Sequence, residues 1–432
     1  MRRDEAISRR RFLRCSAAAS AAFYIAQSSW AKDGSPNEKL NLAFVGVGGM
    51  QGGYNLDQFA PLKENVVALC DVDRNYLDAA AKKYPQAKQY KDFRKLLDQS
   101  NIDAVVVTTP DHTHAVITAA VLHSHRHVYC EKPLTHTVSE ARVVTELARR
   151  HKLVTQMGTQ IHAGDNYRRV VELVQSGAIG TVREVHVWKD GKWDSKPRPP
   201  GKPVPATLDY DLWTGPVEPR PYSEEYVPIN WRRWWHFGGG TLADFGCHFC
   251  DLPFWALNLR APLTVEAEGP PIHPECTPPW LIVRYEFPAR GKLPPVKLTW
   301  YHGGKRPPQV TEGKAPNWGD AVLFVGDKGM LQADYGQRKL LPEKDFAGFV
   351  PPPQTIPNSI GHYKEFCEAC KTGAPTTCNF DYAGALTESI LLGHVSYLLG
   401  EKVEWNSRRL RATNNITALK LIQHHYRPGW RL

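Results

Sequence analysis

Short apolar runs alternate with segments of helical periodicity in the first third of the chain. Apolar strands are expected at 42–45, 65–70, 102–110, 127–130 and 153–157, and helices at 76–84, 90–97, 115–122 and 138–151. Short buried strands joined by helices imply right-handed βαβ crossovers and a parallel sheet. The pattern predicts an α/β domain over residues 38–157.

From residue 158 the pattern changes to an alternation of apolar and polar positions. Strands are expected at 182–188, 263–268, 281–287, 296–301 and 321–326, with helices at 166–175, 360–372 and 382–399. Such alternation is typical of an antiparallel sheet with one face on a core and the other open. Residues 158–432 are therefore predicted to form a second α/β domain with a mainly antiparallel sheet.

The first strand runs directly into a glycine-rich turn. Gly46 permits a tight turn, and Gly48 permits close approach of a pyrophosphate to the following helix N-terminus. The third glycine of G-x-G-x-x-G falls on Gln51, with Gly52 one position later, so the pattern is a looser variant. Glycine turns occur in many folds, and this turn alone leaves nucleotide binding open.

The second strand ends in Asp71-Val72-Asp73. A carboxylate at this place, about 25 residues after Gly46, accepts hydrogen bonds from the ribose hydroxyls of a dinucleotide. Because it also repels a 2′-phosphate, Asp71 favours NAD over NADP. The neighbouring Arg74 keeps NADP open as the alternative.

Charge is concentrated at the N-terminus. The net charge is +10, but six arginines precede residue 32. Ser8–Arg14 matches the twin-arginine export pattern, and a small, weakly apolar stretch leads to a cleavage point after Ala31. Residues 1–31 are predicted to be a signal peptide for periplasmic export; the alternative is a disordered basic tail.

The rest of the chain excludes two classes of partner. It is only mildly basic and has no Lys/Arg run long enough to follow a phosphate backbone, so nucleic acid is not expected. No other segment has the apolar length of a membrane span, so stable membrane insertion is not expected.

Export bears on the mechanism. The twin-arginine route carries folded proteins, so a cofactor bound in the cytoplasm can travel with its protein. An exported nicotinamide enzyme lacks a pool for exchange. We hypothesise that such an enzyme keeps its cofactor and regenerates it within its own cycle.

Cysteine spacing raises the question of a metal. The nine cysteines include Cys247-x-x-Cys250 and Cys367-x-x-Cys370, which could hold zinc. Both pairs lie in helical patterns without the turn residues of a zinc knuckle, where cysteine serves as a small apolar residue. We expect no metal.

Two segments carry residues suited to proton transfer. Lys132, in Glu131-Lys132-Pro133, follows a strand of the first domain and is an acid–base candidate; the alternative is a surface lysine. Asp244 and His248 are spaced to lie on one helix face, where the carboxylate would orient the imidazole and raise its basicity. A purely structural pair, or a metal site with His236 and Asp251, is the alternative.

Tryptophan is abundant, with 13 in the chain, and most are expected in the core. Aromatic residues in glycine- and proline-bordered loops are candidates for stacking on a sugar ring. They are Trp193, Trp231, Trp234 and Tyr301.

Five motifs in this order and spacing resemble the glucose–fructose oxidoreductase / inositol dehydrogenase / MocA (Gfo/Idh/MocA) family. They are Gly46-Val-Gly-Gly, Asp71-Val-Asp73, Thr109-Pro-x-x-x-His114, Glu131-Lys-Pro133 and Asp244-x-x-x-His248. The resemblance implies a Rossmann domain, a second α/β domain with a large open sheet, NAD or NADP between them, and a homodimer or homotetramer.

The resemblance also implies roles for individual residues. Gly46, Gly48, Met50 and Gln51 would meet the pyrophosphate and Asp71 the ribose; Thr109, Pro110 and His114 would line the path to the nicotinamide; Glu131, Lys132 and Gln160 would surround it. Lys132 and His248, with Asp244 behind the histidine, would handle the proton of a substrate hydroxyl.

Three functions remain open. The first is an NAD(P)-dependent oxidoreductase acting on a ring hydroxyl of a sugar or glycoside, with C3 the favoured position. The second is a glycosidase or lyase that uses NAD transiently through a 3-keto intermediate. The third, a non-catalytic carbohydrate-binding protein, would predict loss of Lys132 or His248, and both are present.

Overall fold

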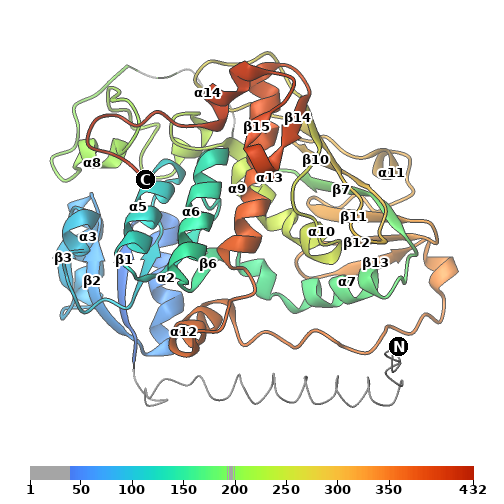
Figure 1. Cartoon of the computed structure of the whole chain (residues 1–432), viewed down its shortest axis with the longest axis horizontal. Coiled ribbons are helices and arrows are strands. Elements are labelled where there is room, and N and C mark those ends of the chain that lie inside the picture. Colours follow the sequence, from blue (N-terminus) through green and yellow to red (C-terminus); the bar gives the residue numbers. More distant parts are fainter. Residues whose placement is uncertain (1–38, 192, 194–197, 199) are drawn as a thin grey trace, which may run out of the picture. The chain divides into compact units, whose positions relative to one another are not determined.

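A computed structural model of the protein describes residues 39–191, 193, 198 and 200–432. The predicted signal peptide at 1–31 lies outside the described residues. Leu40–Leu432 cluster into one unit (Figure 1). Within the described ranges, no helix is both long enough and apolar enough to cross a membrane.

The first sheet is parallel and has six strands in the order β3-β2-β1-β4-β5-β6. Its strands are β1 (Asn41–Val45), β2 (Asn65–Cys70), β3 (Lys88–Tyr90), β4 (Ala104–Val107), β5 (His127–Glu131) and β6 (Thr155–Gly158). This is the doubly wound arrangement that the alternating pattern predicts, with the order reversing between β1 and β4. That switch point is where such sheets bind ligands at the carboxyl ends of their strands.

Helices cover both faces of this sheet. They are α2 (Gly49–Phe59), α3 (Arg74–Lys83), α4 (Phe93–Leu96), α5 (Asp111–His123) and α6 (Val138–His151). A further helix, α12 (His362–Thr372), comes from far along the chain and joins the core of one face. There the Phe59 ring packs edge-on against Tyr363, with centroids 5.1 Å apart, and against Phe366 at 6.4 Å.

The second sheet has nine strands in the order β13-β12-β11-β7-β10-β9-β8-β14-β15. They are β7 (Val182–Lys189), β8 (Thr264–Glu268), β9 (Ile282–Phe287), β10 (Val296–His302), β11 (Ala321–Gly326), β12 (Met330–Ala333), β13 (Arg338–Leu341), β14 (Val403–Asn406) and β15 (Arg411–Ala412). All neighbours are antiparallel except β7 and β10. The predicted fold class is therefore confirmed.

The remaining helices lie mostly between or beside the two sheets (Figure 1). They are α7 (Asp165–Gln175), α8 (Tyr210–Thr214), α9 (Gly240–Phe249), α10 (Asp251–Ala256), α11 (Pro308–Thr311), α13 (Phe380–Leu399) and α14 (Leu419–Ile422). The long helix α13 packs against α6 of the first sheet and against α9. It thereby ties the helix that carries Asp244 and His248 to the parallel sheet.

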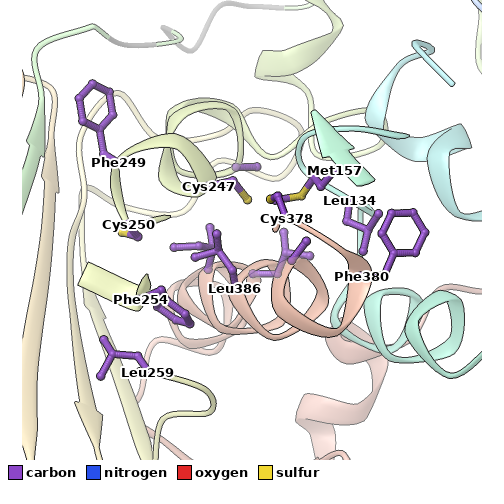
Figure 2. Close-up of a cluster of buried hydrophobic side chains, with 14 of the residues drawn as sticks. Leu134, Met157, Cys247, Phe249, Cys250, Phe254, Leu259, Cys378, Phe380 and Leu386 are labelled. Carbon is purple, nitrogen blue, oxygen red and sulfur yellow. The ribbon is translucent and has the colours of Figure 1, made fainter. Parts of the chain in front are cut away.

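The junction around α13 and α9 is an apolar cluster that includes cysteines (Figure 2). Cys247 and Cys250 are fully buried there, beside Phe254 and Leu386, and the Cys247 thiol lies 3.7 Å from the Thr387 hydroxyl. Burial raises the pKa of the Cys247 thiol to about 12. Both cysteines thus act in this structure as small apolar side chains.

Candidate active site

A cleft runs along the carboxyl ends of the parallel strands. All but one of the predicted cofactor-binding residues line it. These are Gly46, Gly48, Met50, Gln51, Asp71, Thr109, Pro110, His114, Glu131 and Lys132. The exception, Gln160, donates a hydrogen bond to Glu131 Oε1 at 2.9 Å. Residues dispersed over some 90 positions of sequence are thus brought to one edge of the sheet, as the fold requires.

The turn after β1 has the geometry of a dinucleotide-binding turn. Gly46 has φ +83°, and a Cβ there would lie 2.5 Å from the Thr108 carbonyl oxygen. A Cβ at Gly52 would lie 2.6 Å from the Gly46 carbonyl oxygen, so Gly52 provides the close helix–strand packing expected of the third glycine. The N-terminus of α2 therefore lies at the cleft, with backbone N–H groups close to where a pyrophosphate would bind.

Gln51, in place of the third glycine, serves another contact. Its side-chain amide donates to Glu131 Oε1 and to Asn55 Oδ1, both at 3.2 Å. Glu131 Oε1 also accepts from Asn55 at 3.0 Å and from Tyr129 at 3.1 Å. None of the described residues donates to the buried Oε2, which leaves one acceptor for a ligand. Burial raises the pKa of Glu131.

Asp71 braces the glycine turn. Its Oδ2 accepts the backbone N–H groups of Val47 and Gly48, each at 2.9 Å, and its Oδ1 accepts that of Asp73 at 2.9 Å. Burial raises the pKa of Asp71 to about 6 despite these bonds. A carboxylate has further lone pairs, so the ribose contact stays a prediction. Arg74 lies on the surface and pairs with Asp78 at 3.9 Å.

His114 connects two loops at the base of the cleft. One ring nitrogen lies 2.8 Å from the Pro133 carbonyl and the other 2.7 Å from the Thr109 carbonyl. Burial lowers the pKa of His114 to about 4, while the two carbonyl contacts favour the protonated ring and act against that shift. The contacts fix the loop after β4 against the segment that carries Lys132.

Lys132 lies where the two domains meet. Its Nζ donates to Asp244 Oδ1 at 2.5 Å and to the Asp244 carbonyl at 2.7 Å. Arg232 Nε lies 3.2 Å from the same Oδ1, and Trp193 Nε1 donates to Oδ2 at 3.0 Å. Burial alone would raise the pKa of Asp244, but the two cations hold it well below its usual range. The result is a nearly dry cluster of charges at one end of the cleft.

The expected Asp244–His248 pair needs a correction. Asp244 directs its carboxylate to Lys132, Arg232 and Trp193, and the Nδ1 of His248 has no hydrogen-bond partner among the described residues. Burial lowers the pKa of His248 to about 3, and Lys132 lowers it further while Asp244 raises it. The i, i+4 spacing placed both residues on α9, but two cations compete successfully for the carboxylate.

Three of the four predicted sugar-stacking aromatics are buried, although Trp231, at 4% exposure, still lines the cleft. Trp234 is 2% exposed and donates to the Glu225 carbonyl, while Tyr301 is 7% exposed and lies 3.1 Å from His186 in a separate apolar cluster of the second sheet. Neither ring has a free face. Trp231 lines the cleft with Arg232 stacked over it at 4.3 Å, and Trp193 is engaged with Asp244.

The structure adds residues that the sequence did not single out. Asp111, the first residue of α5, lines the cleft at 3% exposure, and burial raises its pKa to about 7. Tyr335 is 41% exposed, stacks on Phe249 with centroids 4.9 Å apart, and lies 6.3 Å from the His248 ring. Asp111 sits in a polar loop that the sequence marked, whereas nothing in the local pattern marked Tyr335.

Two family models match the chain. Residues 40–159 match "Oxidoreductase family, NAD-binding Rossmann fold" and residues 164–293 match "Oxidoreductase family, C-terminal alpha/beta domain", together more than half of the chain. The chain belongs to the Gfo/Idh/MocA oxidoreductase family. Its first domain is of the NAD-binding Rossmann type, so NAD is the cofactor that the family match indicates. The glycine turn and the free Glu131 Oε2 fit that cofactor.

Several members of the family are similar to this chain. Inositol 2-dehydrogenase of Salmonella typhimurium is 31% identical over 151 residues, which are 34% of this chain and 45% of that enzyme. The α-N-acetylgalactosaminidase of Shewanella oneidensis is 27% identical over 155 residues, 34% of each. The chain thus spans less than half the length of these relatives.

A solved structure shares the fold over nearly the whole molecule. GenD2 from gentamicin A biosynthesis, in complex with NAD, superposes with a TM-score of 0.62 at 22% identity and covers 87% of this chain and 99% of its own.

Proposed function

We propose that the protein oxidises a ring hydroxyl of a sugar or glycoside, with C3 the favoured position, and retains its NAD between turnovers. The observation that carries this proposal is Lys132, held at the cleft by Asp244 at 2.5 Å. An ammonium fixed beside a cofactor site can bind a hydroxyl oxygen and stabilise the charge that develops there. The named relatives include an inositol dehydrogenase, which supports a polyol or sugar substrate.

The side chains divide the work as follows. Bound NAD would supply the hydride acceptor. Lys132 would donate a hydrogen bond to the substrate hydroxyl, and Asp244 would keep the lysine in place. The Nδ1 of His248 has no hydrogen-bond partner among the described residues and would accept the hydroxyl proton, although burial opposes this by lowering the pKa of the ring to about 3. The exposed face of Tyr335 would support the sugar ring beside it.

A second candidate is a glycosidase or lyase that oxidises C3 transiently. A 3-ketone acidifies the neighbouring C–H bond, the C1 substituent leaves, water adds, and the ketone is reduced again. The likeness to an α-N-acetylgalactosaminidase favours keeping this candidate. It needs the same lysine and histidine as the first.

One experiment separates the two. Protein purified without added cofactor is denatured to identify released nucleotide, and native protein is incubated with aryl glycosides while absorbance at 340 nm and aglycone release are followed. A lasting absorbance rise that a keto-sugar reverses supports the oxidoreductase. Aglycone release without lasting absorbance supports the glycosidase, and neither signal with any sugar contradicts both.

We also propose export by the twin-arginine pathway to the periplasm and assembly into a homodimer or homotetramer. Ser8–Arg14 supports the first and the family resemblance the second. Fractionation of cells expressing wild-type and Arg9→Lys/Arg10→Lys protein tests export, and light scattering of the purified protein tests assembly.

A further inference from the structure

The C-terminal tail, residues 423–432, runs from the second domain to the open edge of the parallel sheet. Figure 1 shows the C-terminus beside α5, near α8. The Tyr426 hydroxyl donates to Glu140 Oε1 at 2.6 Å, and the Arg427 backbone N–H donates to the Pro216 carbonyl at 3.0 Å. The Arg427 guanidinium pairs with Asp211 at 2.5 Å and is only 11% exposed. The tail is therefore anchored before it reaches the cleft.

The anchored tail places one aromatic ring in the cleft wall. Trp430 lines the cleft, and its ring centroid lies 6.1 Å from that of Phe93. The guanidinium groups of Arg94 and Arg427 lie 4.8 Å and 5.9 Å from the Trp430 centroid. Trp430 is only partly buried, so part of its ring surface is free.

Phe93 and Trp430 lie at the end of the cleft where the adenosine of a dinucleotide is expected. Lys91, Asp92 and Phe93 follow β3, and Asp73 and Tyr76 follow β2; all five line the cleft with Trp430. In a Rossmann fold the pyrophosphate sits at the turn after the first strand and the adenosine ribose at the end of the second. The adenine base then lies beyond Asp71, on the side of β3 and away from β5 and Lys132.

A second segment covers the same end of the cleft. The Asp209 N–H donates to the Val72 carbonyl and the Arg74 N–H to the Thr207 carbonyl, each at 2.9 Å. These bonds fix residues 207–209 across the end of β2, and Leu208, Leu212 and Trp213 line the cleft from there. The adenosine end is thus bounded by two segments from outside the parallel sheet.

We propose that Trp430, with Phe93, forms the wall that contacts the adenine base of NAD, and that the C-terminal tail is a strap that slows release of the cofactor. Aromatic rings bind the faces of nucleobases regardless of sequence. A strap of this kind would serve an enzyme that reuses one cofactor. The inference uses NAD binding alone, so an error in the proposed sugar chemistry would leave its test unaffected.

The test measures binding without turnover. Full-length protein is stripped of nucleotide, and Trp430→Ala, Trp430→Leu and wild type are titrated calorimetrically with ADP-ribose and with nicotinamide mononucleotide. Loss of one aromatic–base contact should weaken ADP-ribose binding about ten-fold. Binding of nicotinamide mononucleotide, which lacks adenine, should not change. Release of NADH, followed by its fluorescence after addition of excess NAD, should accelerate by about the same factor.

Trp280→Ala is the matched control, because Trp280 is also partly buried and carries a stacked cation, Lys305 at 4.1 Å, but does not line the cleft. It should leave both titrations unchanged. Trp430→Leu keeps apolar volume in case the alanine variant folds poorly. Unchanged ADP-ribose affinity in the leucine variant, or an equal loss for nicotinamide mononucleotide, would overturn the proposal.

Discussion

The two ends of the cleft are lined by different kinds of side chain, charged at one end and aromatic at the other. The ionic end consists of Lys132, Asp244 and Arg232, which exclude water and fix one another within 3.2 Å. The aromatic end consists of Phe93 and Trp430, whose rings lie 6.1 Å apart and leave surface open. Buried charges position atoms accurately but tolerate little change, whereas aromatic faces bind a base with loose geometry. We therefore expect the ionic end to govern turnover and the aromatic end to govern cofactor release.

Lys132→Ala should give the largest difference between the effect on turnover and the effect on cofactor binding. It removes the proposed hydroxyl ligand and leaves the aromatic end intact, so we expect turnover to fall by roughly 10²–10⁴-fold. ADP-ribose affinity should stay within about two-fold of wild type, since Lys132 is remote from the adenosine side. Steady-state kinetics and calorimetric titration measure the two quantities.

Lys371→Ala provides the control for that variant. Lys371 is also paired with a carboxylate, Glu64 at 2.5 Å, but it lies on α12 and does not line the cleft. It should retain turnover. Wild-type turnover in folded Lys132→Ala protein that binds NAD would contradict the assignment.

Asp244→Asn should disrupt the ionic end and lower the stability of the protein. Removing one charge from a buried cluster leaves Lys132 and Arg232 unpaired, and we expect the free energy of unfolding to fall by about 3 kcal/mol. Urea denaturation at pH 7 measures this. Glu388→Gln removes the charge of a buried carboxylate that pairs with the half-buried Arg142. It should lose stability but keep wild-type turnover, whereas Asp244→Asn should lose both.

His114, at the base of the cleft, should contribute to the pH dependence of stability. His114 has a folded pKa of about 4, below the ordinary value near 6.5. Its contribution is complete above pH 6.5 and is lost as the pH falls, because only the unfolded chain takes up the proton. Between pH 7 and pH 5 we expect His114 to account for about 2 kcal/mol of lost stability.

Denaturation at the two pH values should show a shallower loss for His114→Gln than for wild type. His112, whose pKa burial lowers to about 3, retains part of the slope. Trp430→Phe at the aromatic end should follow the wild-type slope. Equal slopes for His114→Gln and wild type would show that folding does not lower the pKa of His114.

Local sequence signals predict helices well where the chain carries residues that cap the helix ends. The helix expected at 138–151 matches α6, because Thr137 and Glu140 form a capping box and Lys152 ends the helix in the left-handed conformation. The helix expected at 90–97 is present only in part: β3 pairs with β2 up to Tyr90, and Asp92 then caps the short α4 at Phe93–Leu96. Strand pairing, which depends on a distant partner, overrode the apolar spacing there.

The same limit applies to the site. Motifs that follow parallel strands converge on the cleft because the topology brings strand ends together. Trp234 and Tyr301 were misassigned because glycine and proline neighbours do not determine which way a ring faces; packing buries both. Trp430 and Tyr335 reach the site from the C-terminal tail and from the hairpin between β12 and β13, so only the tertiary fold reveals them.

The smallest effect should be on KM, in a comparison of Tyr335, which lies beside His248, with the buried Tyr301. Tyr335→Ala removes a half-exposed ring, and we expect the KM for the sugar to rise about five-fold, consistent with the loss of about 1 kcal/mol of stacking. Tyr301→Phe keeps its buried ring and removes only the hydroxyl near His186, so KM should not change. Steady-state kinetics with one aryl glycoside measures KM for both variants and the wild type. If Tyr301→Phe raised KM and Tyr335→Ala did not, the sugar would have to bind on the β10 side of the sheet, away from Lys132 and the ionic end.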